Sequence, residues 1–263
     1  MATPYLFLVC LVACCLLMTA AWCWAVKIKN AGVVDVFWAF NFPLIAVLLF
    51  FLADGLELRK QLICGMVLIA GSRLGIHLWQ RVIGYLKEEE GRYQQLRKEW
   101  APQENKKFFW FFQFQAFSNV FLAIPFFVIA VNKDPEISPP EYLGLILWAI
   151  AVFGEAIADW QLTQFKKDPA NKGEVCQSGL WNYSRHPNYF FQLLMWTAYF
   201  VFALGSPMGW IAIISPLIIG YLLFKVTGIP ATEEQALRSK GDKYRNYQKT
   251  TSVFIPWFKN RSS

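Results

Sequence analysis

Apolar residues fill seven stretches of the chain, and polar residues collect in the connections between them. The stretches approach or reach the roughly 17–25 residues that an α-helix needs to cross a bilayer. The pattern predicts an all-α integral membrane bundle of seven transmembrane helices in a single domain, residues 1–263. The predicted spans are Tyr5–Val26, Val33–Leu52, Leu62–Tyr85, Phe108–Val131, Tyr142–Phe165, Tyr189–Leu204 and Trp210–Lys225.

Two polar segments are long enough to carry structure of their own. Lys87–Lys107 is dense in charge, and we expect its first part to extend the third helix beyond the membrane. In Glu233–Thr250, the spacing of Leu237, Tyr244 and Tyr247 predicts a helix with one weakly apolar face.

Basic residues are distributed unequally between the two sides of the predicted bundle. One side collects 19 Lys and Arg residues in its connections and tail, whereas the other holds only Arg59, Lys60 and Lys133. The positive-inside rule makes the 19-charge side cytoplasmic. The C-terminus is therefore expected in the cytoplasm and the N-terminus outside, with Tyr5–Val26 as an uncleaved first span.

Composition supports a membrane protein, because 56% of the residues are hydrophobic and only 16% are charged. The net charge of +7 arises from residues that flank the spans. It therefore favours membrane lipid and a phosphorylated cofactor as partners, and no nucleic acid. The six cysteines show neither a disulfide framework nor metal-ligand spacing, so no metal is expected.

Ionisable residues within spans are costly and are candidates for function. Helical spacing places His77 on one stripe of the third span with Arg73, Arg81 and Tyr85, and most such groups fall in the cytoplasmic half. A cavity open to the cytoplasm would collect them. The other ionisable candidates are Asp35, Glu155, Asp159 and Lys225, and the uncharged polar side chains Asn188, Gln192 and Trp196 join them.

Structural explanations compete with functional ones for several of these groups. Asp35, Arg81 and Lys225 could extend to the membrane interface, and His77 could be a hydrogen-bonded core residue. Arg73 could form an interhelical ion pair with Glu155.

The segment Gly179–Tyr189 combines two cations, two asparagines and three aromatic residues before an apolar run. This composition is typical of a site for an anionic cofactor at the membrane surface. Because no Gly-rich nucleotide-binding loop occurs, side chains would have to bind the phosphates. The candidates are Lys166, Lys172, Arg185 and His186.

Several motifs together resemble those of a known family. They are Asp159–Gln161 with Phe165–Pro169, Gly179–Tyr189, Thr227–Pro230 followed by Glu233, and Tyr244–Tyr247 before Ile255–Trp257. From Asp35 onward the chain resembles the steroid 5α-reductase family, in particular its bacterial branch. Sterol C14 and Δ7 reductases share the Arg185–Tyr189 element, and isoprenylcysteine carboxyl methyltransferases carry a close relative of it.

The resemblance implies an oxidoreductase that uses NADPH to reduce the Δ4 carbon–carbon double bond of 3-oxo-Δ4 steroids or related lipid enones. Asp35, His77 and Tyr85 are the candidates for polarising or protonating the substrate. Gln192 stands where the family usually has Glu, and it can hydrogen-bond a carboxamide but cannot act as an acid. The cofactor-binding candidates are Glu155, Asp159, Lys166, Tyr183, Arg185, His186, Asn188, Tyr189, Gln192, Trp196 and Arg245.

Two other functions remain open. One is an S-adenosylmethionine-dependent membrane methyltransferase of the isoprenylcysteine carboxyl methyltransferase type, and the other is a non-catalytic lipid-binding or transport bundle. For the reductase, we expect a monomer in the bacterial inner membrane, with its active site open to the cytoplasm.

Overall fold

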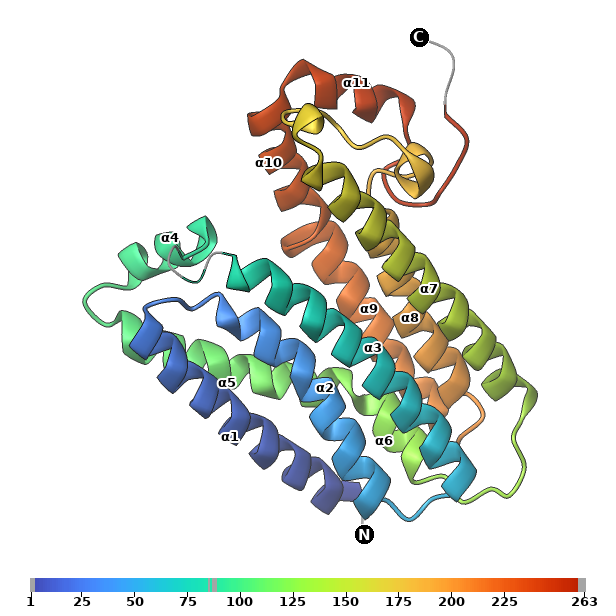
Figure 1. The fold of residues 1–263 in the computed structure, drawn as a ribbon. Coiled ribbons are helices and arrows are strands. Elements are labelled where there is room, and N and C mark those ends of the chain that lie inside the picture. Colours follow the sequence, from blue (N-terminus) through green and yellow to red (C-terminus); the bar gives the residue numbers. More distant parts are fainter. Residues whose placement is uncertain (1–2, 85, 87–88, 260–263) are drawn as a thin grey trace. The chain divides into compact units, whose positions relative to one another are not determined.

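The computed structural model describes residues 3–84, 86 and 89–259 (Figure 1). Within these residues the regular structure is helical, and pairing of the β type is confined to an isolated bridge between Ser184 and Ser252. The chain divides into two compact units. Unit 1 comprises residues 1–137 and 205–211, and unit 2 comprises residues 138–204 and 212–263.

Unit 1 contains six named helices, of which α1, α2, α3 and α5 are the long ones (Figure 1). Helices α2 and α3 pack closely because glycines on α3 face α2. An added Cβ would lie 2.6 Å from the Pro43 side chain at Gly71, and 2.8 Å from the Phe40 ring at Gly75. The helices are α1 (Thr3–Ile28), α2 (Val33–Leu52), α3 (Glu57–Ile83), α4 (Gly91–Trp100), α5 (Glu104–Leu122) and α6 (Ile124–Ala130).

The fourth apolar stretch of the sequence forms two helices, α5 and α6, that meet at a 43° bend. Pro125 lies in the first turn of α6, where its missing N–H costs little. Asn119 joins α5 to α2, since its amide donates to the Trp38 carbonyl at 2.9 Å and its oxygen accepts from Asn41 at 2.8 Å.

The expected extension of the third helix into the first part of Lys87–Lys107 is wrong for residues 89–93, and residues 87 and 88 lie outside the described residues. Helix α3 ends at Ile83, and a separate helix, α4, begins at Gly91. Glu89 lies between them and accepts two hydrogen bonds from Arg97, each 2.8 Å, and one from the Ala31 N–H at 2.6 Å. These polar contacts hold the segment against the start of α2. A continuous helix could not make them.

Arg59 is fully buried in unit 1 at the start of α3. Its guanidinium donates to the carbonyl oxygens of Asn132, Asp134 and Glu136 at 3.2, 2.7 and 2.7 Å. A buried guanidinium needs such acceptors to compensate for lost hydration. Arg59 thus holds the loop after α6 in place. The sequence had only placed Arg59 among the three basic residues on the expected outer side and did not predict this role.

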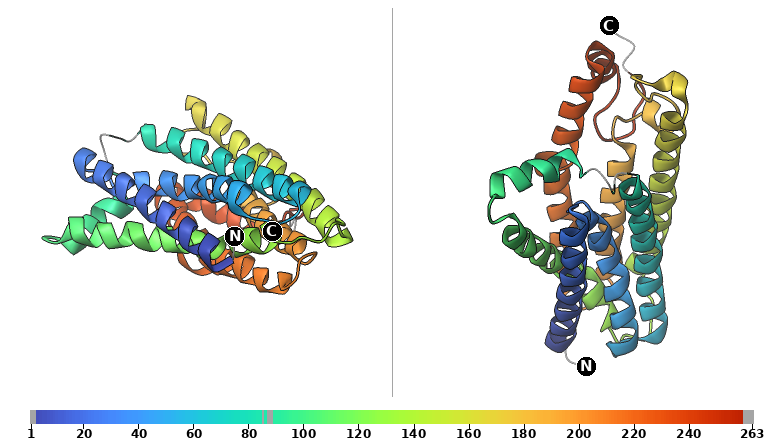
Figure 2. Two further views of the ribbon diagram at one scale, coloured as in Figure 1. Left: turned by 90° about the horizontal axis from the view of Figure 1, so that it is seen from below. Right: turned by 60° about the vertical axis from the view of Figure 1, so that its left-hand side comes forward.

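Unit 2 contains two long antiparallel neighbours, α7 and α8, together with shorter helices (Figure 2). Gly144 and Gly154 allow their close approach, because an added Cβ would lie 2.6 Å from the Phe202 nitrogen and 2.4 Å from the Phe191 ring. The helices are α7 (Pro139–Lys167), α8 (Pro187–Ala203), α9 (Ile214–Tyr221), α10 (Ile229–Lys240) and α11 (Asp242–Thr250).

The polar tail forms two helices, α10 and α11, rather than the single helix expected. The break falls at Gly241, whose φ of +53° belongs to the left-handed region that glycine adopts readily. Leu237 on α10 nevertheless packs with Tyr244 and Tyr247 on α11 around Val175. The predicted apolar face therefore forms, although two helices contribute to it.

Five helical segments are long and apolar enough to cross a membrane, and α5 with α6 makes a sixth if the bent pair is one span. The five are Thr3–Ile28, Val33–Leu52, Glu57–Ile83, Pro139–Lys167 and Gly209–Lys240. These segments indicate a multi-pass membrane protein.

Candidate functional site

Gly179–Tyr189 docks against the end of α7 in unit 2. Two features require glycine at position 179: its φ of +58°, and the Gln161 side chain, which would lie 2.3 Å from an added Cβ. Gln161 then accepts a hydrogen bond from the Leu180 N–H at 2.9 Å, and the Trp181 indole donates to the Ala158 carbonyl at 2.9 Å. The segment is therefore fixed before α8 begins.

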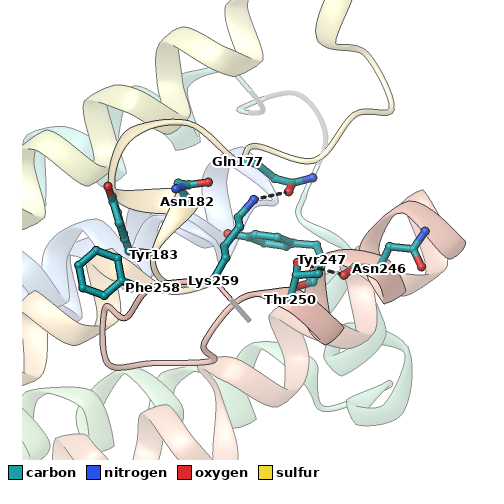
Figure 3. A pocket seen from close by; sticks show the side chains of 8 residues that line it. All are labelled: Gln177, Asn182, Tyr183, Asn246, Tyr247, Thr250, Phe258 and Lys259. Carbon is teal, nitrogen blue, oxygen red and sulfur yellow. Dashed lines mark hydrogen bonds between the residues drawn. The ribbon is translucent and has the colours of Figure 1, made fainter. Parts of the chain in front are cut away.

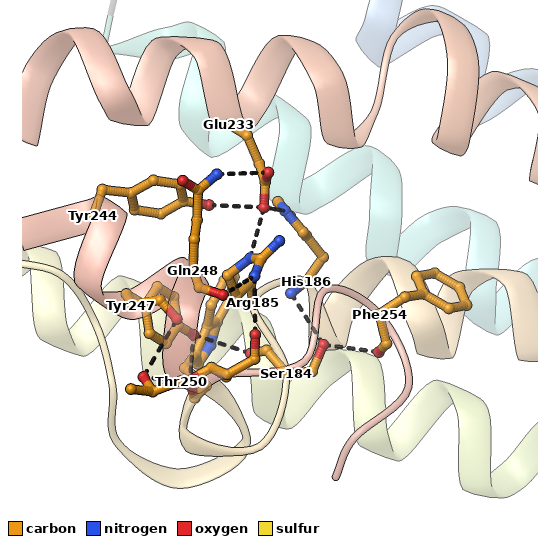
Figure 4. Close-up of polar contacts among 11 residues, drawn as sticks. Ser184, Arg185, His186, Glu233, Tyr244, Tyr247, Gln248, Thr250 and Phe254 are labelled. Carbon is orange, nitrogen blue, oxygen red and sulfur yellow. Dashed lines mark hydrogen bonds and ion pairs between the residues drawn. The ribbon is translucent and has the colours of Figure 1, made fainter. Parts of the chain in front are cut away.

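The C-terminal residues 251–258 wrap around this same segment. The Arg185 N–H donates to Ser252 at 2.8 Å, and the Trp257 N–H donates to Tyr183 at 2.9 Å. The Ser184 hydroxyl donates to the Phe254 carbonyl at 2.8 Å (Figure 4). The C-terminal residues 251–258 and the segment Gly179–Tyr189 are therefore joined by hydrogen bonds, although they lie far apart in sequence.

Arg185 and Glu233 form the centre of a polar cluster at this junction (Figure 4). The Arg185 Nε lies 2.7 Å from the Glu233 Oε1, and its Nη1 donates to the carbonyls of Gln248 and Thr251 at 2.8 and 2.9 Å. Glu233 also accepts from the Gln248 amide at 2.9 Å and from the Tyr244 hydroxyl at 3.4 Å. The guanidinium therefore binds the protein's own tail through these donors, whereas the sequence-based hypothesis directed it to a phosphate.

His186 lies beside this cluster and is almost fully buried. Its Nε2 is 3.3 Å from the Glu233 Oε1, and its ring stacks on Tyr189 with centroids 5.3 Å apart. Burial lowers the pKa of His186 below its ordinary value, although Glu233 opposes this effect. The Tyr189 hydroxyl in turn lies 3.0 Å from that of Thr232. A neutral, oriented imidazole follows from this environment.

A second polar pair connects α7 to the start of α8. The Asn188 amide donates to the Asp159 carboxylate at 3.3 Å. Glu155 lies one helical turn before Asp159 and is also buried. Gln192 and Trp196 follow Asn188 at successive helical turns, so polar groups line the facing sides of both helices.

Three of the predicted cofactor-binding residues lie outside these polar pairs. Lys166 is exposed at the end of α7, and Arg245 is exposed on α11, where it pairs with Asp242 at 2.9 Å. Tyr183 lines a separate pocket of about 630 Å³, where its ring contacts Phe258 (Figure 3).

Two of the catalytic candidates, Asp35 and His77, belong to unit 1. Asp35 accepts hydrogen bonds from Tyr93 at 2.9 Å, from Arg81 at 3.3 Å and from Arg92 at 3.4 Å. Burial is the main cause that raises the pKa of Tyr93 well above its ordinary value, and the negative charge of the nearby Asp35 carboxylate adds to it. Both carboxylate oxygens of Asp35 thus accept hydrogen bonds from other side chains of unit 1.

The two remaining catalytic candidates are His77 and Tyr85. His77 is half-buried on α3, one helical turn before Arg81. Tyr85 lies outside the described residues.

Sequence reasoning missed the roles of Glu233, Gln248, Arg92 and Tyr93. Glu233 stands in one of the motifs quoted for the family resemblance, yet the motif alone does not reveal its partner 48 residues away. Tyr93 and Arg92 fell within the segment that was wrongly expected to be a straight helix. Their pairing with Asp35 depends on that segment folding back.

The fold and this set of buried polar groups define the class as an all-helical membrane protein with polar clusters at its helix ends. Comparison with family models then identifies the family, because the model described as "Protein of unknown function (DUF1295)" matches residues 21–251. The chain belongs to this family. Neither the curated proteins nor the solved structures include a significant match to it.

Proposed function

We propose that the protein is an NADPH-dependent reductase of the carbon–carbon double bond in 3-oxo-Δ4 steroids or related lipid enones. The observation that carries the proposal is the polar cluster at the start of α8. There Asn188 pairs with Asp159, and His186 stacks on Tyr189 and faces Glu233. These residues belong to the motifs that resemble the steroid 5α-reductase family, and a multi-pass membrane protein suits an apolar substrate.

The residues present are chemically suited to the nicotinamide part of the cofactor. The Asp159–Asn188 pair offers both an acceptor and a donor, and Gln192 adds a second amide on the same face of α8. A carboxamide needs both kinds of partner. When bound, NADPH supplies the hydride that adds to the β-carbon of the enone.

The phosphate-binding residues need revision from the sequence-based set. Arg185 already donates to Glu233, Gln248 and Thr251, so we propose that it positions the cluster. Exposed Lys166 and Lys172 remain the basic side chains proposed to meet phosphate groups.

Reduction of an enone places negative charge on the ketone oxygen, and a directed donor there is worth about 3–4 kcal/mol in the transition state. The Asp35 carboxylate already accepts hydrogen bonds from Arg81, Arg92 and Tyr93. We therefore propose His77 or Tyr85 as that donor. We also propose seven spans, with the 17-residue α8 as the additional one, in a monomer of the bacterial inner membrane. The N-terminus would be outside, and the C-terminus and active site would face the cytoplasm.

Cofactor titration tests this proposal against the methyltransferase alternative. Detergent-solubilised protein is titrated with NADPH and with S-adenosylmethionine, and the fluorescence of its 12 tryptophans is followed. We expect saturable binding of NADPH, weakened in Asn188→Ala and unchanged in Asn105→Ala, a control at an exposed position on α5. Binding of S-adenosylmethionine alone would establish the methyltransferase, and binding of neither would favour a non-catalytic bundle.

A further inference from the structure

The C-terminal segment 253–258 presents large apolar side chains outward. Ile255, Trp257 and Phe258 are 60%, 68% and 77% exposed. Yet the backbone that carries them is held in place, because the Trp257 N–H donates to Tyr183 and the Phe254 carbonyl accepts from Ser184. A fixed loop with three exposed apolar side chains is costly in water and indicates a partner surface.

This exposed surface adjoins the outside of a candidate membrane span. Phe254 packs against Phe224 with ring centroids 4.6 Å apart, and against Phe190 at 5.6 Å. Phe224 belongs to the candidate span Gly209–Lys240, and it is itself partly exposed, as is Val226. The apolar surface of the span therefore continues onto segment 253–258. Tryptophan and tyrosine are enriched where such a surface meets the headgroups.

Beside this segment lies the pocket of about 630 Å³, which we call the tail pocket (Figure 3). Figure 3 shows Tyr183 and Phe258 together on one side of it. Its lining also contains side-chain amides and one cation. The lining residues are Gln177, Asn182, Tyr183, Asn246, Tyr247, Thr250, Phe258 and Lys259.

The chemistry of the tail pocket matches a phosphodiester attached to an apolar group. The Lys259 ammonium has three N–H donors, of which one reaches the Gln177 oxygen at 3.0 Å. Asn182 and Asn246 add amide donors, and the Tyr183 and Phe258 rings provide an apolar wall towards the exposed segment. No carboxylate lines the pocket within the described part of the chain.

We propose that the tail pocket binds the headgroup of an acidic phospholipid, while Ile255, Trp257 and Phe258 insert among the acyl chains beside it. We choose a bilayer lipid as the occupant because the Lys259 cation, the side-chain amides and the exposed apolar residues of segment 253–258 occur together beside a candidate span. The net charge of +7 favours an anionic leaflet over a neutral one. This inference does not depend on the proposed reductase activity.

Fluorescence quenching tests the proposal on the full-length protein. Phosphatidylglycerol with brominated acyl chains is titrated into protein held in mixed micelles of detergent and phosphatidylcholine, and the signal of Trp257 is obtained by subtracting that of Trp257→Phe. We expect Trp257 to be quenched by brominated phosphatidylglycerol at a lower lipid fraction than by brominated phosphatidylcholine. Lys259→Gln should raise the half-quenching fraction of phosphatidylglycerol roughly fivefold, the contribution of one basic residue at an anionic surface.

Lys249→Gln is the matched control, because Lys249 is exposed on α11 and does not line the pocket. It should leave the half-quenching fraction unchanged. Equal effects of the two substitutions, or equal quenching by the two lipids, would overturn the proposal. So would a loss of NADPH affinity in Lys259→Gln with unchanged lipid quenching, because the pocket would then serve the cofactor. Failure of the protein to bind NADPH at all would refute the reductase but leave this lipid test intact.

Discussion

Arg185 and Glu233, 48 residues apart, form an ion pair of 2.7 Å that fastens α10 and the C-terminal tail to the start of α8. Both side chains are largely buried, so the attraction is weakly screened by water. The same guanidinium holds the carbonyls of Gln248 and Thr251. The Arg185 side chain is therefore one of the main groups that hold the tail at the polar cluster.

Removing this arginine should loosen the tail. Arg185→Ala leaves the Glu233 carboxylate without its main partner, and we expect a loss of about 3 kcal/mol in stability, as for a broken buried pair. Limited proteolysis should cut α11 faster, and thermal unfolding in detergent should begin earlier. Arg245→Ala removes an exposed pair with Asp242 on the same helix and should change neither measurement. Equal behaviour of the two variants would show that the Arg185 pair does not hold the tail.

Arg59 should be the basic residue on which unit 1 depends most. Arg59→Met keeps much of the apolar volume but removes the hydrogen bonds that the guanidinium donates to the carbonyls of Asn132, Asp134 and Glu136. We expect a loss of about 3 kcal/mol, because a hydrogen bond that involves a charged group contributes roughly 1.5–3 kcal/mol. Thermal unfolding in detergent measures it. Lys133→Met removes only an exposed pair with Asp54 and serves as the control.

The glycines of α7 that face α8 should tolerate no side chain without a loss of stability. At Gly144 an added Cβ would lie 2.6 Å from the backbone nitrogen of Phe202, so Gly144→Ala must push the helices apart. We expect a cost of about 1–3 kcal/mol, typical of overpacking. Gly65→Ala on α3 meets nothing within 4 Å and should be neutral or slightly stabilising. A Gly144→Ala protein as stable as Gly65→Ala would contradict the close packing of these helices.

Acid should destabilise the cluster through His186. Burial lowers the pKa of His186 in the folded protein, so the unfolded chain binds the proton more readily. Stability should therefore be full above pH ~6.5, the ordinary pKa of histidine, and should fall as the pH decreases below it. The groups that face the ring are Glu233, Arg185 and Tyr189.

The melting temperature measured between pH 7.5 and 5 tests this expectation. His186→Gln should flatten the acid side of the profile. An unchanged profile in His186→Gln would mean that other groups cause the acid sensitivity.

Helix positions could be predicted from the sequence because long apolar runs have few alternatives in a membrane protein. The second span was predicted as Val33–Leu52, which are the bounds of α2. The fold-back after Ile83 could not be predicted, since it depends on Glu89 finding Arg97 and the Ala31 N–H. Periodicity describes one helix at a time and carries no information about such contacts.

The candidate site was predictable to a similar extent. The motifs around Arg185 and Asn188 marked a part of the chain where polar side chains do come together, and helical spacing placed Glu155 and Asp159 on one face of α7. The partner of Arg185 was not predictable, because spacing does not show which carboxylate a long side chain reaches. Asp35 illustrates the same limit, since it pairs with Arg81 and Arg92 from other elements.

NADPH oxidation by the purified protein tests whether it reduces lipid enones, as we propose. Protein in lipid nanodiscs is incubated with NADPH and a panel of 3-oxo-Δ4 steroids, and the products are identified by mass spectrometry. We predict NADPH consumption only when an enone is present, with formation of the 4,5-saturated ketone in equal amount. Asn188→Ala should abolish it and Asn105→Ala should preserve it. No NADPH consumption with any enone, by protein that remains folded, would contradict the account.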